Sequence, residues 1–374
     1  MIDRIVKQPL PSATTRCNFA PGVRPPPAVF GKRRWPGCWQ SALTVPGLLV
    51  TRRSGRKQLS AGPRATELGD ERRYGIEEVD GKGLGVIAKL SLEAGDLVFA
   101  ETPQLTFDTD SSQSMRKVKE EFQGMPSTVK DEIMSLEDAW SSRGRKTLRG
   151  IIETNGIECE IAGRSSNTKA VCMNLSRLNH SCNANCDYSW NERDQQMEIY
   201  AQTAISEGEE LCISYIDVRE PRQVRQQMLQ DNWQFRCSCS KCSMRLHSAS
   251  DKRRLRMGEL SALLYSSRSS ARKLRIAKKL LKLYKEEDFA MKSYKLEACQ
   301  FGYDSALELG DMDTAPRFAR LGLRCSLICH GRNHDTTKEH VMFIQASRPR
   351  GASASLSLRA SRQEWMDAVQ AWGS

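Results

Sequence analysis

The sequence lacks any apolar run long enough to cross a membrane. The longest candidate, residues 42–50, is short and is interrupted by Pro46, whereas a membrane-spanning helix needs about 20 apolar residues. A secretory signal core is also missing. Several of the 13 cysteines stand singly in apolar segments, which is not the pattern of a secreted disulfide framework. We therefore expect a soluble intracellular protein, in the nucleus or the cytoplasm.

Acidic residues are almost missing from residues 1–66, which contain twelve Lys or Arg, one acid and nine of the 14 prolines. This composition predicts a disordered basic tail. A mitochondrial presequence is a less favoured alternative because the prolines interrupt an amphipathic helix, and an extension outside the working protein is another. The rest of the chain carries 45 basic and 44 acidic residues. Nucleic-acid binding is therefore not expected of the folded part, although local patches remain open.

From residue 74 the pattern changes to short strands separated by glycine turns. Residues 113–153 differ, because their apolar side chains recur every three or four positions, as in amphipathic helices. The pattern predicts a β-rich domain over residues 67–219 that is interrupted by a helical insert at about 110–158. The expected strands are residues 74–79, 86–88, 97–99, 170–173, 197–201 and 211–215.

Residues after Cys242 follow a helical pattern. Apolar positions form stripes along three expected helices, which resemble tetratricopeptide hairpins without a clean 34-residue repeat, and plain core helices are the simpler interpretation. We expect an all-helical domain over residues 248–340 and a disordered tail over 341–374, because residues 347–361 are rich in Ser, Arg and Ala. The predicted fold class is α+β.

One short segment concentrates polar chemistry. Residues 177–185 place Asn179, His180, Ser181 and Cys182 in a turn-prone stretch. Taken alone, such a loop often satisfies only its own backbone. The segment gains weight because three further motifs accompany it in the chain.

Together, four segments resemble the SET and post-SET motifs of SET-domain protein lysine methyltransferases. They are Lys82-Gly83-Leu84-Gly85, Asn179-His180-Ser181-Cys182, residues 208–215 and residues 235–242. The helical region is similar to fungal SET-domain proteins related to the SET-and-MYND group. The MYND zinc module itself is not visible, since residues 100–158 contain no cysteine. The resemblance implies a SET fold with a threaded pseudoknot, an exception to the usual absence of knots.

The resemblance also implies an S-adenosylmethionine site. Glycines permit close approach of a ligand to the backbone, amide and imidazole groups supply donors and acceptors, and an aromatic ring suits a flat base. Tyr215 is implied as the catalytic residue, at the point of methyl transfer to an amine. The residues implied to bind the cofactor are Lys82, Gly83, Leu84, Gly85, Asn179, His180, Tyr215 and Phe235.

Methyl transfer to a lysine needs positioning above all, and well-oriented reactants gain on the order of 7 to 11 kcal/mol. A lysine with a pKa near roughly 10.4 is almost wholly protonated at neutral pH. We therefore expect activity to rise toward alkaline pH.

A structural zinc ion is the second implied ligand. Cys237, Cys239 and Cys242 supply three thiolates, whereas a tetrahedral structural site takes four. Cys182 is the expected fourth ligand, with Cys186 as its rival. Buried free thiols are the plainer alternative.

The favoured hypothesis is an active lysine methyltransferase, a monomer without membrane association. Its protein substrate carries the target lysine and lies as an added strand along the domain edge. The alternatives are an inactive SET module that binds proteins, a helical scaffold for partner recognition, and nucleic-acid binding through the basic tail.

Overall fold

The computed structural model describes residues 73–109, 114–141, 144–159, 161, 167–244 and 248–346. All of them belong to one compact unit of the chain. The expected tail at 1–66 lies outside the described residues. The expected C-terminal tail also lies outside the described residues from residue 347 onward.

The first sheet joins segments that are far apart in the sequence. Its strands, in spatial order, are β1 (Tyr74–Val79), β2 (Gly83–Ala88), β10 (Glu210–Ile213) and β7 (Asn179–His180). Strand β10 runs antiparallel to β2 and parallel to β7. This pairing brings the glycine turn, the Asn-His segment and the strand before Tyr215 side by side.

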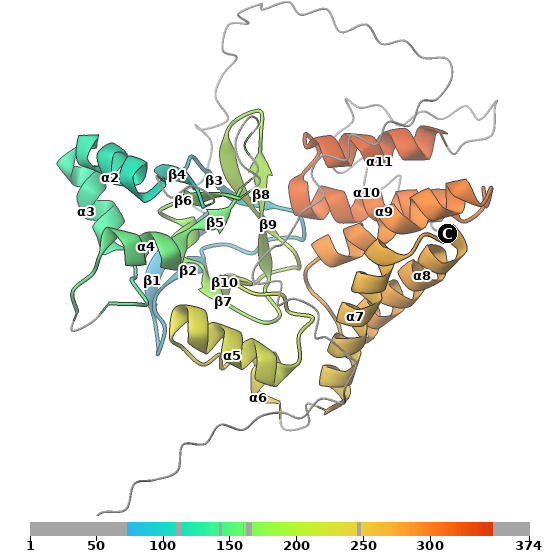
Figure 1. Ribbon diagram of the computed structural model, residues 1–374, viewed down its shortest axis with the longest axis horizontal. Helices are drawn as coiled ribbons and strands as arrows, with labels where there is room; N and C mark the ends of the chain where they lie inside the picture. Colours follow the sequence, from blue (N-terminus) through green and yellow to red (C-terminus); the bar gives the residue numbers. More distant parts are fainter. Residues whose placement is uncertain are drawn as a thin grey trace, which may run out of the picture. The chain divides into compact units, whose positions relative to one another are not determined.

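Two further sheets complete the β-rich part. One consists of β3 (Leu97–Glu101), β9 (Gln196–Ala201) and β8 (Cys186–Asn191), and the other of β4 (Leu105–Asp108), β6 (Thr168–Val171) and β5 (Ile157–Glu158). Between β4 and β5 lies the helical insert, drawn in green in Figure 1. Its helices are α2 (Ser114–Gly124), α3 (Ser127–Ser135) and α4 (Leu148–Asn155). Their buried residues share one core with β4 and β6, so the predicted insert is present.

Several elements were not predicted. Strands β4, β5, β7 and β8 are short or lack a clear alternation. Helix α5 (Arg222–Trp233) begins after Pro221 and ends before Gln234, which adopts a left-handed φ of 60°. The predicted strand 211–215 was too long, because β10 ends at Ile213. The Tyr215 backbone N–H leaves the sheet and donates to the His180 side chain instead.

The C-terminal region is helical, as expected. After the short α6 (Ser240–Ser243) it contains α7 (Ser248–Ser266), α8 (Ser270–Glu286), α9 (Ser293–Glu308), α10 (Ala315–His330) and α11 (Asp335–Ala346). Helix α11 continues six residues beyond the boundary expected at residue 340. The Ser189 hydroxyl on β8 lies 2.8 Å from His330 Nδ1 on α10. Among the described helices, none combines the length and apolar character that crossing a membrane requires.

Candidate functional site

The glycine turn before β2 depends on two different properties of glycine. Gly83 has a φ of +74°, a conformation that side chains with a Cβ rarely adopt. Gly85 is buried, and a Cβ there would lie 2.6 Å from Val79 Cγ2 and 2.9 Å from Asn179 Nδ2. The absence of a side chain at Gly85 therefore allows Asn179 to approach β2.

Glu210, at the start of β10, connects the predicted site residues on either side of it. Its carboxylate forms an ion pair with Lys82 and accepts a hydrogen bond from Asn179 Nδ2 at 2.9 Å. Asn179 also donates to the Leu84 carbonyl at 3.3 Å. Burial opposes the charged form of Lys82, but the hydrogen bond and charge of Glu210 outweigh it and raise the pKa of that amine. Glu210 thus holds the turn against the Asn-His segment.

The His180 side chain is hydrogen-bonded to the backbone of Tyr215. The Tyr215 N–H donates to His180 Nδ1 at 3.0 Å, so a neutral imidazole carries its proton on Nε2, which lies 3.3 Å from Cys182 Sγ. The Tyr215 hydroxyl donates to the Leu178 carbonyl at 2.7 Å. Burial is the main cause that raises the pKa of the Tyr215 phenol, and the negative charges of Cys212 and Glu210 raise it further. The hydroxyl therefore stays protonated at neutral pH.

Aromatic rings gather around Tyr215. Its ring centroid lies 5.3 Å from that of His180, 5.2 Å from Trp233 and 6.4 Å from Phe235. The Phe235 ring meets Tyr215 edge on, at an angle of 87°. Trp233 donates from Nε1 to the Thr154 carbonyl at 3.0 Å, which ties this group to the helical insert. Sequence reasoning missed Trp233, although its position two residues before Phe235 was an available signal.

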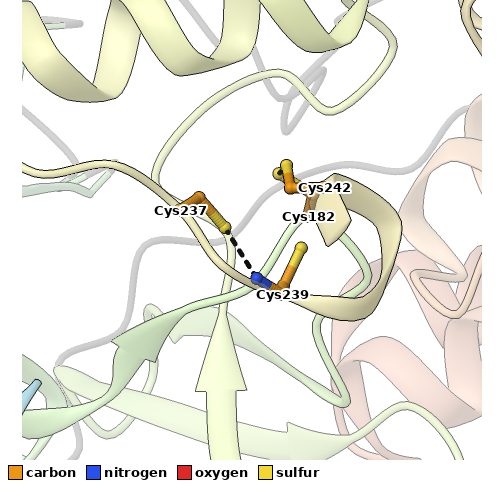
Figure 2. A group of neighbouring side chains, drawn as sticks. All are labelled: Cys182, Cys237, Cys239 and Cys242. Atoms are coloured by element: carbon orange, nitrogen blue, oxygen red, sulfur yellow. Dashed lines mark hydrogen bonds between the residues drawn. The ribbon is translucent and has the colours of Figure 1, made fainter. Parts of the chain in front are cut away.

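Four cysteines lie together beside this aromatic group. The Sγ atoms of Cys182, Cys237, Cys239 and Cys242 all lie within 4.8 Å of one another, and Figure 2 shows the side chains from the two segments converging. Cys186, the rival fourth ligand, is outside this set. It begins β8 and is paired with Ala201.

The chemistry of this donor set fits zinc. Zinc–thiolate bonds of about 2.3 Å in a tetrahedron separate the sulfurs by roughly 3.8 Å, and the Cys182 and Cys242 sulfurs lie 3.6 Å apart. Hydrogen bonding to Cys182 lowers the pKa of Cys239 and lowers that of Cys242 to about 6. Hydrogen bonds to Cys237, Cys239 and Cys242 raise the pKa of Cys182. Hydrogen bonding to Cys182 lowers the pKa of Cys237, but the bonds to Cys239 and Cys242 outweigh it and raise that pKa. Cys239 and Cys242 are thus the favoured thiolates, the form that binds metal, and a bound metal ion would displace the protons of the other two thiols.

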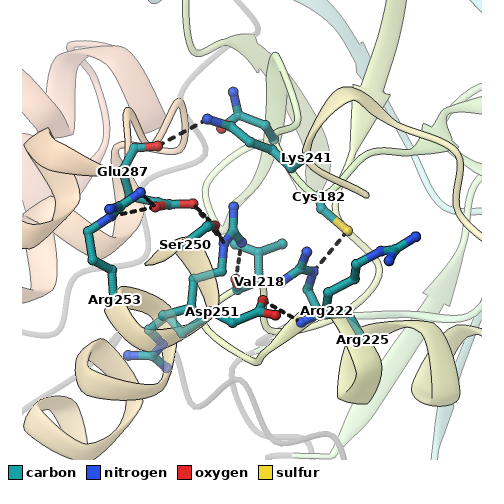
Figure 3. Close-up of polar contacts among 12 residues, drawn as sticks. Cys182, Val218, Arg222, Arg225, Lys241, Ser250, Asp251, Arg253 and Glu287 are labelled. Carbon is teal, nitrogen blue, oxygen red and sulfur yellow. Dashed lines mark hydrogen bonds and ion pairs between the residues drawn. The ribbon is translucent and has the colours of Figure 1, made fainter. Parts of the chain in front are cut away.

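A buried arginine contacts this cluster and was also missed from the sequence. Arg225 is 1% exposed, and its guanidinium donates to Cys182 Sγ at 3.2 Å and to Cys242 Sγ at 3.7 Å. Figure 3 shows it beside a polar network at Glu287. There Arg254, which is fully buried, donates to the Glu287 carboxylate at 3.0 Å. Lys241, between two of the cysteines, donates to the Glu287 carbonyl at 3.1 Å.

Comparison with known proteins agrees with this arrangement. Residues 83–216 match the SET domain. The histone-lysine N-methyltransferase set5 of Schizosaccharomyces pombe is 29% identical over 187 residues, covering 48% of this chain and 54% of that protein. The N-lysine methyltransferase SMYD2 of Gallus gallus is 29% identical over 158 residues, covering 41% and 34%. The protein-lysine N-trimethyltransferase SMYD5 of Mus musculus is 40% identical over 70 residues, covering 18% and 17%. The chain thus spans about half, or less, of the length of these relatives.

Proposed function

We propose, from the premise that residues 83–216 form a SET domain, that this chain is a protein-lysine N-methyltransferase that uses S-adenosylmethionine. The names of its relatives describe lysine methyltransferases, one of them acting on histones. The observation that carries the proposal is the junction of β2, β7 and β10. There Asn179 donates to Glu210. The adjacent His180 accepts from the Tyr215 backbone N–H, and the Tyr215 hydroxyl donates to the Leu178 carbonyl. We propose that the substrate is a histone or another protein.

The cofactor site is proposed to lie along the glycine turn and the Asn-His segment. When bound, S-adenosylmethionine supplies a methyl group activated by a sulfonium. Lys82, Gly83, Leu84 and Gly85 would line it, because the open space at Gly83 lets a ligand approach the backbone of the turn. The other proposed contacts are Asn179, His180 and Tyr215, with the Phe235 ring against the adenine.

Tyr215 is the proposed catalytic residue. Its proton is engaged by the Leu178 carbonyl, so the phenolic oxygen keeps lone pairs for accepting contacts from the amine and the transferring methyl group. A lysine amine held beside this oxygen would attack in its neutral form and take the methyl group from the sulfonium, leaving S-adenosylhomocysteine, and the proton lost from the amine would pass to solvent. Trp233 and Phe235 are proposed to exclude water from the point of methyl transfer, which favours the neutral amine there.

The four cysteines are proposed to hold one structural zinc ion. Cys182 follows the Asn-His segment, and Cys237, Cys239 and Cys242 follow Phe235. A metal bound to all four would hold the proposed cofactor residues against the aromatic group. Its role is to close the site, since four protein ligands leave no open position for catalysis.

The proposed organisation follows the sequence boundaries. Residues 67–219 form the SET domain, whose last strand threads the family's pseudoknot, and residues 220–247 form the post-SET zinc segment. Residues from 248 onward form the tetratricopeptide-like helical domain, which extends to Ala346 at the end of α11. A protein substrate is proposed to lie along an edge of the SET domain as an added strand.

The test is calorimetric binding of S-adenosylhomocysteine to the full chain, with zinc determined on the same samples. We expect binding with about one zinc per chain. Asn179→Ala should weaken binding, whereas Asn232→Ala, at an exposed position on α5, should not. Transfer of a radioactive methyl group to core histones or fractionated cell protein then identifies the substrate. A folded, zinc-loaded protein that binds no cofactor would reject the enzyme and favour a protein-binding SET module.

A further inference from the structure

Helix α8 concentrates the positive charge of the folded part. Its 17 residues contain seven Lys or Arg and a single acid, Glu286. The chain after residue 66 has a net charge of only +1, so the near-neutral average conceals a strongly basic helix. The basic residues are Arg272, Lys273, Arg275, Lys278, Lys279, Lys282 and Lys285.

The basic residues share one exposed face. Helix α8 buries its apolar positions, including Leu274, Leu280 and Tyr284, in the C-terminal core. Lys273 is half-buried and lies over the Phe301 ring. The other six are exposed and, at about 100° per residue, fall within an arc of roughly 140°. They form a row that covers about 20 Å of the helix at about 1.5 Å per residue.

Few acids oppose this row within the described part of the chain. Glu286 lies 3.8 Å from Lys282. Asp311, in the turn after α9, has its pKa lowered by hydrogen bonds from Thr314 and, less strongly, by the charge of Lys278. Two acids against six bases leave the row strongly positive.

This arrangement is unfavourable for a face that only contacts water. Basic residues recur at three- and four-residue intervals, as at Arg275, Lys278 and Lys282, and like charges at these spacings destabilise a helix. A solvated helix avoids that cost by mixing acids with bases, as α2 does with Arg116 and Glu120. The unmixed row is therefore better explained by a polyanionic partner.

We propose that the exposed face of α8, from Arg272 to Lys285, binds the phosphate backbone of duplex DNA. A rigid row of cations about 20 Å long complements the evenly spaced phosphates of a stiff duplex. The other exposed residues of α8 are Ala271 and Glu286. The face thus has no aromatic ring on which single-stranded bases could stack, and no aromatic or apolar anchor of the kind that protein interfaces use.

The binding is independent of base sequence and sensitive to salt. Lysine contacts phosphate as a point charge, and contacts to the backbone alone carry no sequence information. None of these residues belongs to the proposed methyltransferase site. An experiment can therefore reject DNA binding by α8 without rejecting the proposed methyltransferase activity, and the reverse.

The test compares two triple variants of the full chain by fluorescence anisotropy with a labelled DNA duplex, from about 50 to 200 mM salt. One is Arg275→Gln, Lys278→Gln and Lys282→Gln. The control is Lys117→Gln, Lys119→Gln and Arg193→Gln, at exposed positions of α2 and the β8–β9 turn. Both variants have the same net charge and keep the basic residues 1–66, so any binding by that segment contributes equally. Circular dichroism checks that both remain folded.

We expect the α8 variant to bind at least roughly tenfold more weakly. Its plot of log K against log salt concentration should be shallower by about 2 to 3, because each phosphate contact contributes about 0.9. The control should remain closer to the wild type on both measures.

Equal losses in the two variants would overturn the proposal in favour of an effect of overall charge. Tighter binding of duplex RNA than DNA, lost in the α8 variant, would reassign the face to RNA. Unchanged DNA binding with weakened binding of polyglutamate would reassign it to an acidic protein. A wild-type chain that does not bind the duplex would reject it outright.

Discussion

Arg225 and Cys182, 43 residues apart in the chain, meet through a hydrogen bond from the guanidinium Nε to the sulfur at 3.2 Å. The same guanidinium reaches Cys242 Sγ at 3.7 Å. A zinc ion with four thiolates carries two net negative charges, and burial of such a charge requires compensation. Arg225 supplies a cation in direct contact. Arg254 adds a second cation whose charge is shared with Glu287.

Arg225→Gln should therefore lose zinc more readily, by roughly 10- to 100-fold in affinity, because second-shell partners tune metal binding by this amount. Zinc release to a chelating dye measures the effect. Arg225→Lys keeps the charge but not the paired N–H donors, and should be intermediate. Arg236→Gln, at an exposed arginine beside Cys237, is the control. Equal zinc release from all four proteins would contradict a role for Arg225 at the metal.

Tyr215→Phe should abolish most methyl transfer while leaving S-adenosylhomocysteine binding largely intact. The phenolic oxygen is proposed to act on the transferring group, and the loss of one such contact costs roughly 100-fold or more in rate. Single-turnover methylation and calorimetry separate the two effects. Tyr303→Phe removes another hydroxyl that donates to a carbonyl, at 3.3 Å from Phe343 O, and should retain activity. Full activity of Tyr215→Phe would remove this residue from the mechanism.

Gly85→Ala should weaken cofactor binding and destabilise the fold. The added methyl group would overlap Val79 and the Asn179 amide, and overpacking of this kind costs about 1 to 3 kcal/mol. Urea unfolding and calorimetry measure the two consequences. Gly124→Ala on α2 meets no atom within 4 Å and should be neutral or slightly stabilising. Unchanged binding in Gly85→Ala would mean that the approach of Asn179 to β2 is not needed for the cofactor.

Stability should fall as the pH is lowered from about 6.5 to 4. Burial lowers the pKa of His340 to about 4 and also lowers that of His330. Because the unfolded chain binds these protons more readily, the stabilisation is complete above the unfolded pKa of about 6.5 and is lost as the pH falls toward the folded value. For His340 the full effect is about 3 kcal/mol.

His340→Gln should reduce this pH dependence, which urea unfolding at pH 7 and pH 5 measures. The variant should also be less stable at pH 7, because the imidazole packs against Gly322 and its Nδ1 lies 2.8 Å from the Thr336 carbonyl oxygen. The difference between the two pH values, compared with the wild type, is therefore the informative quantity. An identical difference in both proteins would exclude His340 as a source of acid sensitivity.

Features that depend on residues close together in the sequence could be predicted from it. The helical insert follows from apolar spacing, and the turn at Gly83 follows from the need for a positive φ. Cys237, Cys239 and Cys242 lie within six residues, a spacing typical of the ligands of one metal ion. The SET domain itself was predicted because its motifs are local and ordered along the chain.

The tertiary structure decided which distant residues join these local motifs. Cys182 and Cys186 were equivalent by spacing, and only the pairing of Cys186 into β8 leaves Cys182 with the cluster. Arg225 and Trp233 lie on α5, and nothing in the local sequence around Arg225 indicates a contact with the cysteines. Their roles arise because α5 contacts the cysteines through Arg225 and the Tyr215 ring through Trp233. Contacts between segments far apart in the chain depend on how the whole chain packs, and no single stretch of sequence contains that information.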